Sequence, residues 1–447
     1  MKKQTCLKAI PLLAVLAGSL VGCSGPKYDA TLVVYNWEDY IYDGTDEDGN
    51  EIPDDPGVCA LFEDYYEEKT GLKVKVDYET FSTNEIMYQQ IDLDIMHADL
   101  ICPSDYMIQK MANEGKLEKL SYNETTKKYG ESLSNWEKNG SPYIKEKFSE
   151  AKLDDGNSFL SYSIPYFWGT MGFTYDMNYF TAEEISTWDA LWSTESKFQR
   201  NFTLKDSMRD TYVAGIFHVY KDEIAALDVN ASDYNEKLSA IFNRCDDETI
   251  AKVKSALTSI KGKTVYGFEV DDGKDEIVKG TYHANLAWSG DSVYSMDTAE
   301  EAGARLGYAL PKEGSNIWFD GWCMPKGANV ELAEEFLNFI SQPEIAAKSM
   351  DAVGYTSAVA GEEIWDLVND WYAAEDDETE VDECDLSYFF GDSIEGEAKI
   401  NILTEERGRQ FDAQYPSLEQ IKKCCIMKDF GAQTTKVDDM WAEVKAA

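Results

Sequence analysis

Segments with helical and with strand periodicity alternate along the first part of the chain. LVVY at residues 32–35 is apolar throughout, as in a buried strand, whereas LKVKVDY at residues 72–78 alternates strictly between apolar and polar side chains. Residues 59–70 carry four apolar or aromatic side chains on one helical face, and Gly71 would end that helix. The pattern predicts strands at residues 32–35, 72–78 and 98–102, and helices at residues 59–70, 82–94 and 107–115.

Strands that alternate with helices predict a parallel sheet, and hence an α/β fold class. Ligands of such sheets bind beyond the carboxyl ends of the strands. Two of these ends carry aromatic and acidic side chains: WEDY at residues 37–40 after the first strand, and SDY at residues 104–106 after the third. We expect both groups to lie at the same edge of one sheet.

Composition and charge narrow the range of partners. The chain has 447 residues, 43% of them hydrophobic, which is enough for two or three domains with substantial cores. Its formal net charge is −43. Such a surface repels nucleic acid, whose binding depends on Lys and Arg at phosphates, and it attracts cations. General solubility is an alternative explanation of the charge.

The N-terminus has the layout of a secretory signal. Lys2 and Lys3 precede an apolar stretch at residues 7–22, which is shorter than the roughly 20 apolar residues that span a membrane. The ending LVGC at Cys23 resembles a bacterial lipobox, so we predict a lipoprotein signal peptide at residues 1–22 and lipidation of Cys23. Acyl chains on Cys23 would anchor the protein outside the cell membrane, each buried methylene contributing about 0.8 kcal/mol. An ordinary signal peptide followed by an unrelated Cys is the alternative.

The remaining Cys and His residues indicate neither a metal site nor a nucleophile. No CxxC spacing occurs, so we expect no zinc, no other metal and no cofactor. A disulfide between Cys384 and Cys424 or Cys425 is left open. The three His residues lie far apart in sequence and no nucleophile–base set is visible. The sequence therefore predicts a binding protein rather than an enzyme.

Two acidic stretches, residues 43–57 and 373–385, have the composition of solvated loops or insertions. The first is similar to a calcium-binding loop, but Gly44 and Asp55 stand where such a loop has its first ligand and its bidentate Glu. We therefore expect two acidic loops without a bound ion.

More aromatic–acid pairs follow later in the chain. LAWSGD contains Trp288 and Asp291, and IWFDGWCMP places Trp318 and Asp320 two residues apart, on one side of a strand. Tyr355 lies within VGYTSA, and LKDSMRD at residues 204–210 adds further acids beside an Arg.

Nine motifs, and their order along the chain, resemble those of the substrate-binding protein of bacterial spermidine/putrescine ABC transporters. They are YNWEDYI, TGLKVKVDYETFSTNEIMY, CPSDYMIQKMANEGKLEKL, SIPYFWGT, TWDALW, LAWSGD, WFDGWCMPKGA, LNFISQPEIAAKSMDAVGYTSA and YPSLEQIK. The resemblance implies a two-lobed periplasmic-binding-protein fold of type II with the ligand in a cleft between the lobes. By analogy, lobe one comprises residues 30–169 and 319–362, and lobe two residues 170–318 and 363–447.

The resemblance also implies a set of ligand-binding residues. Three positions leave the choice between putrescine and spermidine open: Ser207 stands where the family has an acid, Met427 where some members have Gln, and Asp291 matches the putrescine-binding branch. Asp206, next to Ser207, is a possible substitute for the missing acid. The ligand-binding residues carried over are Trp37, Asp39, Tyr40, Ser104, Tyr106, Asp210, Trp288, Asp291, Trp318, Asp320 and Tyr355.

These residue types suit a polyamine on physical grounds. A buried ammonium group needs carboxylate or carbonyl acceptors, and its methylene linkers need flat apolar walls. An aromatic face adds about 0.5–2 kcal/mol for each cation–π contact. The resemblance further implies an ABC permease and its ATPase as partners. A sugar-binding or carbohydrate-active lipoprotein, and a binder of another organic cation, are the alternatives.

Overall fold

The computed structural model describes residues 28–45, 49–270, 272–375 and 378–447. The predicted signal peptide at residues 1–22 and the predicted lipidation site Cys23 lie outside the described residues. Among the described residues, no helix is long and apolar enough to cross a membrane.

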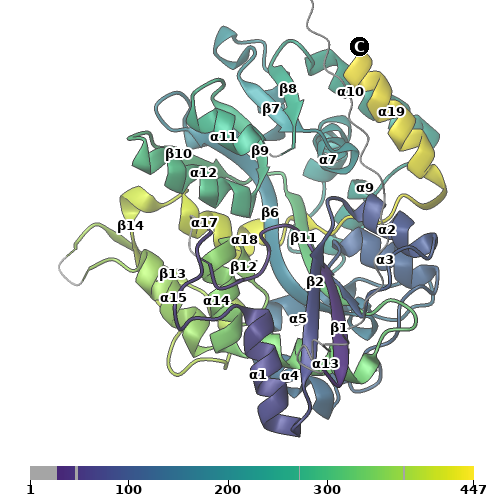
Figure 1. Cartoon of the computed structure of the whole chain (residues 1–447). Coiled ribbons are helices and arrows are strands. Elements are labelled where there is room, and N and C mark those ends of the chain that lie inside the picture. The colour runs from purple at the N-terminus through teal and green to yellow at the C-terminus, as the bar shows by residue number, and fades with distance from the viewer. Residues whose placement is uncertain (1–27, 46–48, 271, 376–377) are drawn as a thin grey trace, which may run out of the picture.

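One large sheet runs through the molecule, in the order β2-β1-β3-β11-β6-β9-β7-β8 (Figure 1). Its two central strands, β6 (Ser163–Asp176) and β11 (Ser315–Cys323), are long, buried and antiparallel to each other. The other strands of this sheet are β1 (Ala30–Asn36), β2 (Val74–Thr80), β3 (Leu100–Ile101), β7 (Phe202–Lys205), β8 (Val265–Glu269), β9 (Ala284–Trp288), β10 (Leu306–Ala309), β12 (Thr356–Ser357) and β15 (Cys424–Cys425).

Lobe one is built on the parallel strands β1, β2 and β3, so the predicted parallel α/β arrangement is confirmed. The predicted helix at residues 82–94 forms with Thr83 as its N-cap; Met87 on this helix is buried, whereas Ile86 is 45% exposed. The helices of this lobe are α1 (Val58–Thr70), α2 (Asn84–Asp92), α3 (Asp105–Asn113), α4 (Ser134–Asn139), α5 (Pro142–Glu150), α13 (Val330–Ile340) and α14 (Pro343–Val353).

Lobe two repeats this plan on the parallel strands β7, β8 and β9. Helices α7 and α12 directly follow β7 and β9, so that their first turns lie beyond the carboxyl ends of these strands. The helices of this lobe are α6 (Ala182–Ile185), α7 (Met208–Val219), α8 (Lys221–Ala225), α9 (Tyr234–Phe242), α10 (Asp247–Ile260), α11 (Asp272–Val278), α12 (Ser289–Glu301) and α19 (Thr434–Ala446).

The C-terminal segment divides between two hydrophobic clusters. Ile364 and Val368 of α15 (Glu362–Tyr372) pack in the cluster that contains the core of lobe one, whereas Val437 of α19 packs in the cluster of lobe two. The assignment of residues 363–447 to lobe two stays a prediction. Its other helices are α16 (Ser387–Phe390), α17 (Gln410–Gln414) and α18 (Leu418–Ile421).

The two acidic stretches differ from each other. The described part of residues 43–57 lies outside the helices and strands, as predicted, and its Asp55 carboxylate pairs with Lys348 at 2.7 Å. The expectation of a loop over residues 373–385 is wrong at its end, where β13 (Val381–Asp385) pairs with β14 (Lys399–Leu403).

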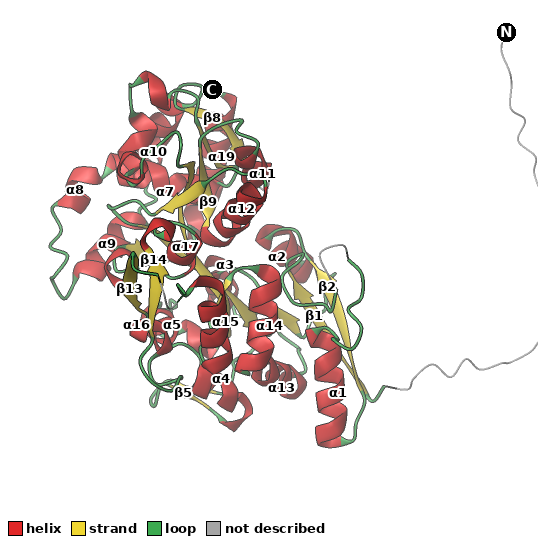
Figure 2. Cartoon of the chain, turned by 90° about the vertical axis from the view of Figure 1, so that its left-hand side faces the viewer, coloured by secondary structure: helices red, strands yellow, loops and turns green. Residues whose placement is uncertain are grey.

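Figure 2 shows the two lobes one above the other, with α7, α10, α12 and α19 in the upper lobe and α1, α13 and α14 in the lower. The remaining short elements are β4 (Tyr122–Asn123), β5 (Lys128–Tyr129), η1 (Glu131–Leu133), η2 (Phe159–Ser161), η3 (Trp188–Trp192), η4 (Ser196–Phe198), η5 (Thr404–Glu406) and η6 (Gly431–Gln433).

All seven cysteines of the described chain carry free thiols. The disulfide left open between Cys384 and Cys424 or Cys425 is absent from this structure. Cys424 and Cys425 are buried, so they contribute to packing as small apolar side chains.

Candidate functional site

The carboxyl ends of parallel strands from both lobes supply the predicted residues. In lobe one, the WEDY segment follows β1, and Ser104 and Tyr106 follow β3, which is the direct neighbour of β1. In lobe two, Trp288 ends β9, and Asp210 and Asp291 lie in the first turns of α7 and α12. A helix N-terminus favours a carboxylate at such a position.

The central strands bring in the rest of the site. Trp318 and Asp320 project from β11, and Tyr355 comes directly before β12. Glycines make room for the two aromatic rings, because an added Cβ at Gly169 would overlap Trp318 and one at Gly290 would overlap Tyr355.

A chain of contacts joins these residues across the lobes. The Tyr40 hydroxyl donates to the Asp320 carboxylate at 2.8 Å, and the Tyr40 and Tyr355 ring centroids lie 5.6 Å apart. The Tyr355 hydroxyl donates in turn to Asp291 of lobe two at 2.8 Å. Trp318 packs edge-on against Tyr355, at 5.5 Å between ring centroids. We call the whole set the acid–aromatic row: Trp318, Asp320, Tyr40, Tyr355, Asp291, Trp288 and Asp210.

A lysine that the sequence analysis did not single out occupies this row. The Lys205 ammonium lies 2.8 Å from the Asp291 carboxylate and 3.8 Å from the centroid of the Trp288 ring. The Trp288 indole nitrogen donates to Asp210 at 3.4 Å. In the sequence, the only sign of Lys205 is its position at the end of the strand segment FTLK. In the structure, all four residues of this strand are buried.

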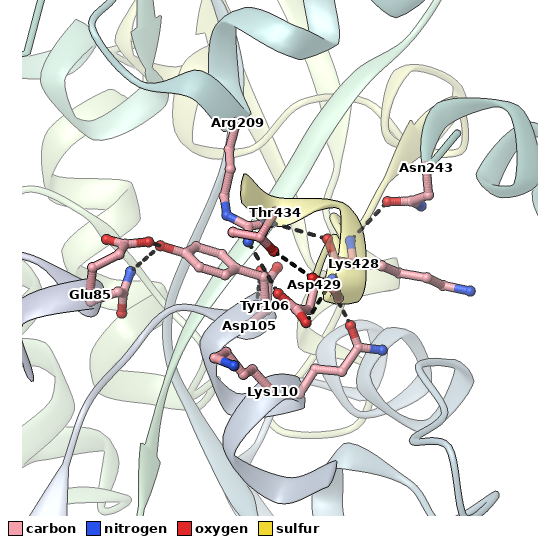
Figure 3. Close-up of polar contacts among 12 residues, drawn as sticks. Glu85, Asp105, Tyr106, Lys110, Arg209, Asn243, Lys428, Asp429 and Thr434 are labelled. Atoms are coloured by element: carbon pink, nitrogen blue, oxygen red, sulfur yellow. Dashed lines mark hydrogen bonds and ion pairs between the residues drawn. The ribbon is translucent and has the colours of Figure 1, made fainter. Parts of the chain in front are cut away.

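A second protein cation covers the aromatic ring of Tyr106 (Figure 3). The Arg209 guanidinium descends from α7 and lies 3.8 Å from the Tyr106 ring centroid. It also donates to the Lys428 carbonyl at 3.2 Å and to the Asp429 carboxylate at 3.3 Å. The Tyr106 hydroxyl donates to Glu85 at 3.0 Å, so this ring joins lobe one to α7 and to the C-terminal segment.

Ser104 lies next to both Asp320 and α2. Its backbone forms an isolated bridge with Asp320, and its side-chain oxygen accepts a hydrogen bond from the Asn84 amide at 3.1 Å. The same amide donates to the Tyr106 hydroxyl at 3.0 Å. Asn84 is buried and was not predicted, and it fixes the orientation of two predicted residues.

The pKa values of the three carboxylates of the row are shifted in different directions. Burial raises the pKa of Asp320 to about 6, although hydrogen bonds from Ser104 and Tyr40 act in the opposite direction. Burial likewise raises the pKa of Asp210. Burial would also raise the pKa of Asp291, but the nearby Lys205 ammonium outweighs it and lowers that pKa below its ordinary value.

Four predicted residues lie outside the row: Ser104 and Tyr106, described above, and Asp39 and Trp37. Asp39 is exposed, with a left-handed φ of 52°. Trp37 is half-buried and packs on Phe81 at 4.6 Å between ring centroids. Their part in ligand binding stays a prediction.

The positions at which the sequence departs from the family pattern have other roles here. The Ser207 side chain caps α7 by accepting from the Asp210 amide at 3.3 Å. Asp206 accepts from the Trp441 indole and pairs with Lys445, so its carboxylate is already engaged away from the row. Met427 is buried in the hydrophobic cluster of lobe two.

Comparison with known proteins identifies the family. The sequence profile of the bacterial extracellular solute-binding proteins matches residues 60–373. The chain belongs to this family. The spermidine/putrescine-binding periplasmic protein of Salmonella typhimurium is 26% identical over 327 residues, which are 73% of this chain and 76% of that protein. The putrescine-binding periplasmic protein SpuD of Pseudomonas aeruginosa is 24% identical over 97% of both chains.

Solved structures confirm the predicted two-lobed α/β fold of this solute-binding protein. The spermidine/putrescine ABC transporter substrate-binding protein PotD of Streptococcus pneumoniae covers 93% of this chain and 99% of its own, with a TM-score of 0.61 at 23% identity. The Tp0655 lipoprotein of Treponema pallidum covers 93% of this chain and 100% of its own, with a TM-score of 0.59 at 16% identity.

Two cavities of the solute-binding protein lie away from the row. One cavity, of about 310 Å³, is lined by residues of lobe two: Asp206, Phe268, Glu269, Val270 and Asp272. Another, of about 510 Å³, lies among α12, α15 and α17. None of the predicted ligand-binding residues lines either cavity, and Lys205 and Arg209 instead cover the aromatic faces of the site.

Proposed function

We propose that this protein captures a polyamine, putrescine or spermidine, between its two lobes and delivers it to the membrane permease of an ABC transporter. The row would hold ammonium groups at its carboxylates and methylene linkers against its aromatic rings. The relatives of Salmonella typhimurium and Pseudomonas aeruginosa, a spermidine/putrescine-binding and a putrescine-binding protein, support the same ligand class.

The observation that carries this proposal is the position of the Lys205 ammonium. A primary ammonium group already lies between a carboxylate of the row and the face of Trp288. The same two contacts are what a polyamine ammonium needs after it leaves water. The chemistry of the row therefore suits alkylammonium ions better than neutral sugars, which would gain nothing from its carboxylates.

The protein would act outside the cytoplasmic membrane, tethered by lipid on Cys23. This part of the proposal depends on the LVGC sequence and the apolar stretch before it. Closing of the two lobes around the ligand would present a joint surface to the permease, with the lobes moving about β6, β11 and the other crossings between them.

Isothermal titration calorimetry of residues 24–447, refolded to remove bound ligand, tests the function. We expect putrescine or spermidine to bind with 1:1 stoichiometry and glucose to give no heat. Choline that binds more tightly than either polyamine would favour the alternative of another organic cation. Binding of glucose alone would overturn the polyamine assignment and favour the sugar-binding alternative.

A further inference from the structure

Both the backbone and the side chain of Lys205 make specific contacts with neighbouring elements. Lys205 is 2% exposed and ends β7, which pairs with β8 and β9. Its carbonyl accepts a hydrogen bond from the Thr211 hydroxyl at 2.6 Å. The ammonium reaches the Val270 carbonyl at 3.1 Å in addition to Asp291 and Trp288. These three partners hold the buried ammonium in place. If it moved away, Asp291 would become an unpaired buried charge, which is costly.

Lys205 and Tyr355 together use both carboxylate oxygens of Asp291. Lys205 donates to Oδ2 and the Tyr355 hydroxyl to Oδ1, each at 2.8 Å. Neither Asp210 nor Asp320 forms an ion pair with another residue in the described part of the chain. When all three carboxylates are ionised, the single ammonium of Lys205 leaves two negative charges in the row, at Asp210 and Asp320.

We propose that Lys205 is a built-in cation that fills one ammonium subsite of the row, so that the ligand is a diamine such as putrescine rather than a triamine such as spermidine. This inference rests on the proposed function. A diamine would neutralise Asp210 and Asp320. A third ammonium would have to be desolvated without a carboxylate partner, and that cost discriminates against spermidine.

Replacing Lys205 with Met tests this inference, because Met keeps an unbranched chain and removes the charge. We expect Lys205→Met to raise the affinity for spermidine relative to putrescine by about tenfold, as a vacated carboxylate and aromatic face become available. In the double variant Lys205→Met/Asp291→Asn this relative gain for spermidine should vanish. Titration calorimetry of refolded protein with both amines gives the ratio of affinities, and circular dichroism checks folding.

A matched control removes a lysine from the surface near the same strand end. The side chain of Lys445 is 41% exposed and pairs at 2.8 Å with Asp206, the residue that follows Lys205 in the sequence. Lys445→Met should leave the spermidine-to-putrescine ratio unchanged, since solvent screens exposed charges. A similar change in both Met variants would show that general electrostatics sets the ratio and would overturn the role of Lys205.

The other outcomes separate this inference from the proposed function. If wild type binds polyamines and Lys205→Met leaves the ratio unchanged, or raises both affinities equally because the ligand merely displaces the lysine, the inference is wrong and the function stands. If the wild-type protein binds spermidine more tightly than putrescine, the inference is likewise wrong and the proposed function stands. If neither wild type nor Lys205→Met binds a polyamine, the proposed function fails and the inference with it. Should Lys205→Met not fold, Lys205→Gln provides the same comparison.

Discussion

Replacing the Asp320 carboxylate with an amide should stabilise the ligand-free protein while it weakens ligand binding. Asp320 is 8% exposed, and burial raises its pKa from 3.8 to about 6. A carboxyl group with a raised pKa in the folded state opposes folding once it is ionised. A shift of about two units corresponds to about 3 kcal/mol at pH values above 6. Asp320→Asn removes this cost and keeps an acceptor for the Tyr40 hydroxyl.

The effect should depend on pH in a specific way. Below pH 3.8 the carboxyl group is protonated in both folded and unfolded chains, so Asp320→Asn and wild type should differ little in stability. Between pH 3.8 and 6 the wild type loses stability relative to the variant, and above pH 6 the full difference is present. Urea denaturation of refolded residues 24–447, followed by tryptophan fluorescence at pH 3.5 and pH 7.5, measures both limits.

Two results would show that the buried charge of Asp320 does not destabilise the ligand-free protein. A variant that is less stable than wild type at pH 7.5 would mean that the Asp320 carboxylate supports the fold and is not reserved for a ligand. A stabilisation of equal size at both pH values would mean that the change acts through packing or the unfolded chain rather than through the charge.

Further predictions concern pH, packing and thiols. Polyamine affinity should fall about tenfold from pH 7.5 to pH 5, because Asp320 must lose its proton to pair with an ammonium. Asp320→Asn should reduce this pH dependence, and an affinity that is constant between the two pH values in the wild type would contradict the prediction. Gly290→Ala should push the Tyr355 ring aside and cost about 1–3 kcal/mol of stability, measured by urea denaturation. The control Gly267→Ala, with open space at its Cβ, should cost less, and equal losses would exclude the clash. Dithiothreitol should leave the melting temperature unchanged, since the described cysteines are free, and a drop would reveal a disulfide.

Local patterns were enough to predict the sheet edges that carry the site. The apolar run at residues 32–35 and the strand at 98–102 correspond to β1 and β3, which pair directly. The order of strands and helices then places the residues that follow them at one edge. Strand 72–78 is displaced, starting at Val74 and ending at Thr80, because periodicity fixes the face of a strand better than its ends.

Contacts between lobes could not be predicted from periodicity. Tyr355 and Asp291 lie 64 positions apart in sequence, and only the tertiary fold brings them together. Lys205 was missed because nothing local says which carboxylate a lysine will reach. Asp39 was placed in the site by resemblance, whereas its backbone adopts a left-handed conformation and its side chain is exposed.

If the row holds two ammonium groups, a diamine should bind more tightly than a monoamine with the same carbon chain. Titration calorimetry of refolded residues 24–447 with putrescine and with 1-aminobutane gives the contribution of the second ammonium group. We predict that putrescine binds at least about tenfold more tightly, since the second ammonium gains a charged hydrogen bond at a buried carboxylate. Equal affinities for the two amines would mean that the row does not bind a second ammonium group.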